Sequence, residues 1–465
     1  MTIIEFVNKK IIFLPLLFIL ILLAANAPAQ TEENNIEFVM SRIAELLLAS
    51  NYDEAINLFD TITPSERNSS RIKLIEASVL SSMGRQAEAR TIAQAVSNTE
   101  PNNTHALFVL ATIEGIEGRT RQEQQILEQI INIEPENVTA LLALGNLNLR
   151  NRAIRQAAAN FHRVLSLNPD NPQALLGMGR AFRMNREFED AEPFFNRVVE
   201  LYPEMAEARA ERARFNRGRN FMFLALEDFE EAKRLDPNDY WIAVDTGTLL
   251  VEMNRRSQAL EEFNRAIRID PDIFLAYAYS APLKDEAGDP DAAMRDYATL
   301  ARLRPDYYFA LEGVGLHQMR LENWAEARDA FAEAYRQAPE EHLYALLAAI
   351  AWMRMGDITA PRTFLFQVQS RVARDTLEWH MFRLFHDLTS RNFASETDLL
   401  LRLDREEDEI LKARMHFYMG KYYDVRGNTN GANRQYITVY ELNQRAIPEW
   451  RLNDWILDKR GIRPF

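Results

Sequence analysis

The chain has 465 residues, a formal net charge of −14 at pH 7 and no cysteine. This acidity argues against a general nucleic-acid binder, which needs a positive surface to neutralise phosphates. The lack of cysteine excludes disulfides, thiolate metal sites and a lipid attached to a cysteine.

The first 29 residues are predicted to be a secretory signal peptide. Two lysines precede an apolar run at 11–25, and small residues at 27–29 supply a cleavage site after Ala29. The run is short for a membrane span, which needs about 20 apolar residues. We expect cleavage and export to the periplasm or cell envelope. A retained segment would instead anchor the exported chain to a membrane.

Prolines mark a strict internal repeat. They recur every 34 residues, at Pro101, Pro135, Pro169, Pro203, Pro237, Pro271, Pro305 and Pro339. A proline stops a helix, because it lacks the amide and restricts the residue before it. Units that start three residues after each proline fill residues 36–375 with ten copies, and they open at Ile36, Ser70, Thr104, Val138, Pro172, Ala206, Tyr240, Phe274, Tyr308 and His342.

Three further columns repeat in register with the prolines. The eighth residue of a unit is almost always small, the twentieth is usually alanine and the twenty-fourth is usually a large aromatic, as in Gly145, Ala157 and Phe161. Positions one turn apart share a helical face, so these columns predict two closely packed helices with an aromatic between them.

These columns resemble the tetratricopeptide repeat family, whose small, small, large aromatic and proline positions have the same offsets. The resemblance implies an all-α fold, a right-handed superhelical solenoid of about twelve 34-residue helix-turn-helix repeats that bury their apolar faces on their neighbours. The large first-helix aromatic of the family is mostly replaced, as by Leu107 and Leu141. This departure alters the packing but not the class.

The repeat register weakens after residue 375. We expect a degenerate unit and acidic connector at 376–412, a further repeat-like unit at 413–446, and a C-terminal capping helix and tail at 447–465. The capping helix is predicted to cover the last exposed apolar face.

The resemblance also implies that the second, fifth, ninth and twelfth residues of each unit line a concave wall. Their spacing keeps them on one side of the first helix. The wall has two candidate partner-binding parts, an arginine cluster and an apolar strip. The cluster is Arg180, Arg183, Arg214 and Arg217, and the strip is Trp241, Val244, Leu275, Phe309, Leu316, Met319, Leu343, Leu346 and Ile350.

An apolar strip beside arginines suits a peptide groove, with anchors for side chains and guanidinium forks for carboxylates. The alternative is that a tightly wound superhelix or the terminal helices bury part of the strip. Pro282 lies inside a predicted first helix, where it should bend or break about one turn.

Motifs for chemistry are missing from the sequence. The histidines lack metal-ligand spacing, and neither a phosphate-binding glycine loop nor a G-x-S-x-G elbow occurs. We therefore expect no metal, no cofactor and no enzymatic activity. The predicted function is a protein-interaction scaffold of the cell envelope that binds a peptide or protein in its concave groove.

The alternative function is a structural subunit of an outer-membrane or cell-wall assembly complex. A soluble monomer on size exclusion would favour the scaffold, and co-purification in a fixed large complex would favour the structural subunit. The sequence leaves the partner, the pathway and the oligomeric state open.

Overall fold

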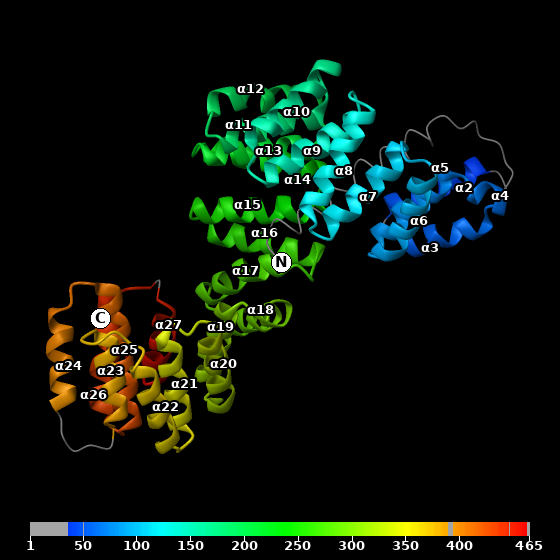
Figure 1. Ribbon diagram of the computed structural model, residues 1–465. Coiled ribbons are helices and arrows are strands. Elements are labelled where there is room, and N and C mark those ends of the chain that lie inside the picture. Colours follow the sequence, from blue (N-terminus) through cyan, green and yellow to red (C-terminus); the bar gives the residue numbers. More distant parts are fainter. Residues whose placement is uncertain (1–35, 50, 389–393, 446, 463–465) are drawn as a thin grey trace. The chain divides into compact units, whose positions relative to one another are not determined.

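The computed structural model describes residues 36–49, 51–388, 394–445 and 447–462 (Figure 1). Throughout these ranges the regular elements are helices, which confirms the predicted all-α repeat fold. The predicted signal peptide at 1–29 lies outside the described residues. Within the described part, each helix is too short or too polar to cross a bilayer.

The described residues form two compact units, divided between Leu235 and Asp236. In the first unit, consecutive helices pack as antiparallel pairs that stack on the next pair. Its elements are α2 (Ile36–Leu48), α3 (Tyr52–Leu58), η1 (Phe59–Thr61), α4 (Pro64–Arg67), α5 (Ser70–Ser82), α6 (Gln86–Thr99), α7 (Thr104–Ile116), α8 (Thr120–Ile133), α9 (Val138–Arg150), α10 (Ile154–Leu167), α11 (Pro172–Met184), α12 (Phe188–Leu201), α13 (Ala206–Gly218) and α14 (Met222–Leu235).

The second unit continues the same pairing. Its elements are α15 (Tyr240–Glu252), α16 (Arg256–Ile269), α17 (Phe274–Glu286), α18 (Pro290–Leu303), α19 (Tyr308–Arg320), α20 (Trp324–Gln337), α21 (His342–Arg354), α22 (Thr359–Gln369), α23 (Leu377–His386), α24 (Ala394–Arg405), α25 (Glu409–Val425), α26 (Thr429–Leu442) and α27 (Pro448–Lys459).

The first helix of each pair begins where the sequence opens a repeat. Asn103, Asn137 and Asn171 each accept a hydrogen bond from the backbone N–H three residues further on. These side chains satisfy amides that have no partner within the helix, so they fix the start of α7, α9 and α11.

The turn between the two helices of a pair has its own column. A residue with positive φ recurs there every 34 positions, and only some of these residues are glycine. A side chain in the left-handed region costs about 1 kcal/mol, so the non-glycine members are mildly strained. The column consists of Gly84, Gly118, Arg152, Arg186, Asn220, Asn254, Gly288, Glu322 and Gly356.

The small and aromatic columns meet in space. A Cβ added to Gly145 would lie 2.6 Å from the Phe161 ring, which is fully buried. A Cβ on Gly177, from the next first helix, would meet the same ring at 2.6 Å. Each aromatic thus fills a space left open by small residues on both sides, which is how neighbouring repeats hold together.

The two ends of the repeat array depart from the regular pattern. The second helix of the first repeat ends at Leu58, and α4 starts at Pro64, which cannot continue a helix. The acidic stretch near the C-terminus is more than a connector, because Asp408 caps α25 by accepting hydrogen bonds from Ile410 and Leu411. Helix α25 therefore begins at Glu409, four residues before the predicted unit.

Candidate functional site

The predicted arginine cluster lies on α11 and α13 of the first unit, where it surrounds a buried carboxylate. Arg180 contacts Glu207 at 2.7 Å and Glu211 at 3.1 Å, while Arg214 and Arg183 approach Glu211 at 2.7 and 3.6 Å. Burial alone would raise the pKa of Glu211, but Arg180, Arg214 and Arg183 outweigh it and hold that pKa well below its usual range. The guanidiniums of Arg180, Arg183 and Arg214 therefore gather around one carboxylate.

Three of these guanidiniums are therefore already engaged. The side chain of Glu211 is only 8% exposed, so the ion network is largely buried between α11 and α13 and is not an open surface. Arg217, the fourth predicted member, is half-buried on the same helix, α13. The prediction that these guanidiniums are open to a partner's carboxylates is wrong for Arg180, Arg183 and Arg214, because Glu211 already binds them.

Part of the predicted apolar strip belongs to the core of the second unit. Met319, Leu343, Leu346 and Ile350 are between 0% and 5% exposed, so the expected accessibility is wrong for these four residues. They pack in one cluster with Phe417 and its neighbours, because α25 lies against α21. The sequence also allowed this alternative, in which the terminal helices bury part of the strip.

Val244 needs the same correction. It is 3% exposed on α15, where Ile242, Ala243 and Leu249 are also buried. The apolar sequence of this helix is buried on several sides, so Val244 is core and not wall. Trp241 on the same helix is half-buried.

The rest of the strip stays accessible. Leu275 and Leu316 are half-buried, and Phe309 is 49% exposed. Phe309 and Leu316 lie together on α19 and line one cavity of the second unit. This cavity is the candidate functional site.

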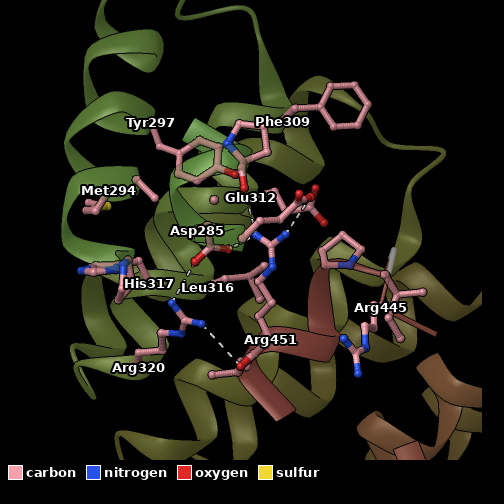
Figure 2. A pocket seen from close by; sticks show the side chains of 18 residues that line it. Asp285, Met294, Tyr297, Phe309, Glu312, Leu316, His317, Arg320, Arg445 and Arg451 are labelled. Atoms are coloured by element: carbon pink, nitrogen blue, oxygen red, sulfur yellow. Dashed lines mark hydrogen bonds and ion pairs between the residues drawn. The ribbon is translucent and has the colours of Figure 1, made fainter. Parts of the chain in front are cut away.

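The cavity lies where α17, α18 and α19 meet α27 and the residues just before it (Figure 2). Its volume is about 210 Å³, below the roughly 300–1,000 Å³ of sites that enclose a whole small-molecule ligand. The space therefore suits one side chain of a larger partner. It is lined by Pro282, Asp285, Glu286, Pro290, Ala293, Met294, Tyr297, Phe309, Glu312, Gly313, Leu316, His317, Arg320, Arg445, Ile447, Pro448, Arg451 and Leu452.

Arg451 fastens α27 to this side of the repeats. Its guanidinium forms an ion pair with Asp285, lies 3.1 Å from Glu286 and donates a 3.4 Å hydrogen bond to the Pro282 carbonyl. Arg320 completes the group, since it pairs with Asp285 at 3.1 Å and donates to the Arg451 carbonyl at 3.4 Å (Figure 2). The charges of Asp285 and Glu286 are thus matched inside the protein.

The proline in this wall does not interrupt its helix. Helix α17 runs from Phe274 to Glu286 with Pro282 inside it, so of the predicted bend or break the break is wrong. The neighbouring turns and the packed pair partner α18 hold the helix in place despite the missing amide. Asp285 therefore stays in helical register, next to Arg451.

One carboxyl that lines the cavity, that of Glu312, is not paired with a cation in the described part of the chain and has a raised pKa. Glu312 forms no ion pair with another described residue, and it accepts a hydrogen bond from the hydroxyl of Tyr344. The pKa of Glu312 is raised to about 7, first by burial and then by the charge of Glu449, against the opposing effect of Arg414. Near neutral pH this group therefore exchanges a proton.

Arg414 is already committed to the other carboxylate. It donates to Glu449 at 2.9 and 3.1 Å, and the Tyr418 hydroxyl donates to the same oxygen at 2.8 Å. Glu449 is 1% exposed. The guanidinium of Arg414 is paired with Glu449 and reaches Glu312 only through its charge, which leaves one negative charge in excess when Glu312 is ionised.

The repeat pattern predicts only the residues that α19 contributes to this site. Phe309 and Leu316 follow from the spacing along the first helix, and the same spacing places Glu312 on that face. Arg451 and Glu449 were missed, because they come from the capping helix more than 130 positions further on. No pattern within a 34-residue unit reports such a distant contact.

Comparison with known proteins indicates the repeat family to which parts of this fold belong. The fold is that of an α-helical repeat solenoid, a class built to present extended surfaces. The sequence profile described as tetratricopeptide repeat matches residues 142–206 and 280–342, one stretch in each unit. Both matched stretches are tetratricopeptide repeats, in the register of the columns that recur along residues 36–375. A comparison with curated protein sequences gives no significant match.

Solved structures resemble the chain in fold alone. A tetratricopeptide repeat protein from Parabacteroides merdae is 16% identical with a TM-score of 0.45, and the match covers 53% of this chain and 98% of that one. YrrB, described as having an unusual peptide-binding site, is 22% identical with a TM-score of 0.36 over 41% of this chain and 98% of its own. PilF of Pseudomonas aeruginosa is 17% identical with a TM-score of 0.37 over 46% and 96%.

Proposed function

We propose that this chain is a non-enzymatic scaffold of the cell envelope that holds a peptide or protein partner at the cavity beside α19. Tetratricopeptide repeat proteins bind protein or peptide partners. The observation that carries the proposal is the open cavity on the first-helix side, with Phe309 49% exposed at its edge and Leu316 half-buried within it. Solvent-facing apolar groups next to a concavity are typical of partner contacts.

The size of the cavity supports a macromolecular partner. Its 210 Å³ accommodates an anchoring side chain, while the rest of the partner lies along the first helices. The envelope location rests on the predicted signal peptide at 1–29. It is tested by cell fractionation and by N-terminal sequencing of the mature protein, which should begin at Gln30.

A site-specific crosslinker tests the binding surface. A photoreactive phenylalanine at Phe309 should capture one partner in cells, and the same residue at Phe366 on α22 should not. Phe366 is a suitable control because it is 60% exposed and lies on a second helix away from the cavity.

The captured partner is then purified and its affinity is measured directly. Phe309→Ser should weaken binding about tenfold, since an anchoring aromatic contributes more than 1 kcal/mol. Equal capture from both positions, or unchanged affinity of the Phe309→Ser protein, would contradict the proposed surface.

A further inference from the structure

The cavity combines one unmatched acid with aromatic walls. Its other acidic residues, Asp285 and Glu286, are paired with Arg451. Glu312 alone among the lining acids forms no ion pair with another described residue. Tyr297 and Phe309 also line the cavity, and aromatic faces attract cations within about 6 Å.

The arginines that line the cavity are likewise engaged. Arg320 and Arg451 share Asp285. Arg445 donates to the Asn443 side chain at 2.8 Å, and its guanidinium lies 5.3 Å from the centre of the Trp450 ring. These cations have local partners, so none of them is committed to Glu312.

We propose that this cavity is a subsite for a basic side chain, lysine or arginine, of the partner, with Glu312 as its counter-ion and Phe309 and Tyr297 as its aromatic walls. The proposal rests on the function proposed above and names the chemistry that the partner must offer. A cation would supply the charge that Arg414 cannot give to Glu312 and Glu449 together. The protein's net charge of −14 would attract such a partner from a distance.

A proton and the partner's cation would compete for the same carboxyl. With its pKa raised to about 7, Glu312 is mostly protonated at pH 6 and mostly ionised at pH 8. Cation binding should therefore strengthen as the pH rises through 7 and should release a proton. The titratable and charged groups near Glu312 are Tyr308 on α19, Glu341 at the N-terminus of α21, Tyr344 on α21, Arg414 and Tyr418 on α25, and Glu449 on α27. The others that line the cavity are Asp285, Glu286, Tyr297, His317, Arg320, Arg445 and Arg451.

The test uses the full chain and four small probes. N-acetyl-arginine amide and N-acetyl-lysine amide carry the predicted cation, and the norleucine and glutamate amides are matched probes without it. Saturation-transfer NMR should show binding of the two basic probes only, and their affinity should rise about five- to tenfold from pH 6 to pH 8, following the ionised fraction of Glu312.

Three variants separate the subsite from a general acidic surface. Glu312→Gln should abolish binding of the basic probes and its pH dependence, and Glu312→Asp should retain both in weaker form. Glu326→Gln removes an exposed acid on α20 and should change nothing. Circular dichroism checks that each variant is folded.

Two results would overturn the subsite. One is equal binding of the norleucine and arginine probes, and the other is undiminished binding of the basic probes by folded Glu312→Gln protein. If the partner crosslinks at Phe309 but binds the Glu312→Gln protein as tightly as wild type, the subsite is wrong and the proposed function stands. If the basic probes bind through Glu312 but Phe309 captures nothing, the subsite stands and the proposed function is wrong.

Discussion

Glu211 in the first unit and Glu312 in the second both lie on first helices, but their charges are balanced in opposite ways. Three guanidiniums surround Glu211 and hold its pKa below the usual range. The cation near Glu312, Arg414, is paired with Glu449 instead, and the pKa of Glu312 rises to about 7. Burial opposes ionisation at both sites, so the number of cations per carboxyl decides the outcome. The charge of Glu211 is neutralised within the protein, whereas the charge of ionised Glu312 is not paired with a cation among the described residues.

The largest effect is expected from Leu346→Ser, which tests how much of the second unit's wall is core. Leu346 is 0% exposed, so the change should lower the free energy of unfolding by about 3–5 kcal/mol through a cavity and a buried hydroxyl. Phe309→Ser is the matched control at a half-exposed position and should cost less than about 1 kcal/mol. Urea unfolding followed by circular dichroism measures the free energy of unfolding of both variants. A Leu346→Ser protein as stable as wild type would show that Leu346 is not a core residue.

Glu211→Gln should weaken the first unit nearly as much. The change leaves Arg180, Arg183 and Arg214 without their shared counter-charge, and breaking such a partly buried network costs about 3–5 kcal/mol. Glu207→Gln removes an outer partner of Arg180 alone and should cost about 1 kcal/mol or less. Similar losses for the two variants would mean that Glu211 is not the centre of the network.

The stability of the protein should depend on pH through Glu312. The folded-state pKa of Glu312 is raised from 4.5 to about 7, so between these values the folded protein holds a proton that the unfolded chain has released. Raising the pH through this window therefore removes stability, and the loss is complete above about pH 7. From pH 5 to pH 8 the wild type should lose on the order of 1–3 kcal/mol relative to Glu312→Gln, which mimics the protonated form. Parallel profiles in thermal melts would show that Glu312 is an ordinary carboxyl.

The smallest effect concerns the strained turn that both units contain. Arg152 (φ 56°) and Glu322 (φ 58°) occupy the left-handed column, where glycine has no steric cost. Arg152→Gly should stabilise the protein by about 0.5–1 kcal/mol. Glu322→Gly should gain less, because it also loses the 2.8 Å ion pair with Lys459 on α27. Equal gains in thermal unfolding would show that this ion pair contributes nothing.

The regular part of the fold could be predicted from sequence because each repeat carries its own instructions. The proline, small and aromatic columns are local patterns, and the structure places Phe161 against Gly145 as they indicate. The left-handed turn position was not predicted as a repeat column, because only some repeats have glycine there. Arg152 and Glu322 occupy the same position in two other repeats.

The candidate site could be predicted only in part. Helical spacing put Phe309 and Leu346 on the same wall, yet one is 49% exposed and the other is 0% exposed. The difference comes from α25, which packs on α21 after the repeat register has shifted. Whether a wall position is exposed to solvent therefore depends on which later helices pack against it. The sequence of a single repeat does not encode this long-range packing.

The position of α27 also has a consequence for how the second unit comes apart. In a simple solenoid each repeat contacts only the next one, so the terminal repeats fray first and unfolding proceeds stepwise. Here α27 is tied to α17 through Arg451, and Lys459 ties it to Glu322 in the turn between α19 and α20. Helices α19 to α27 form a closed circuit of contacts, and the last repeats cannot peel away without releasing the middle ones. Their amides should therefore exchange with solvent in a single cooperative step.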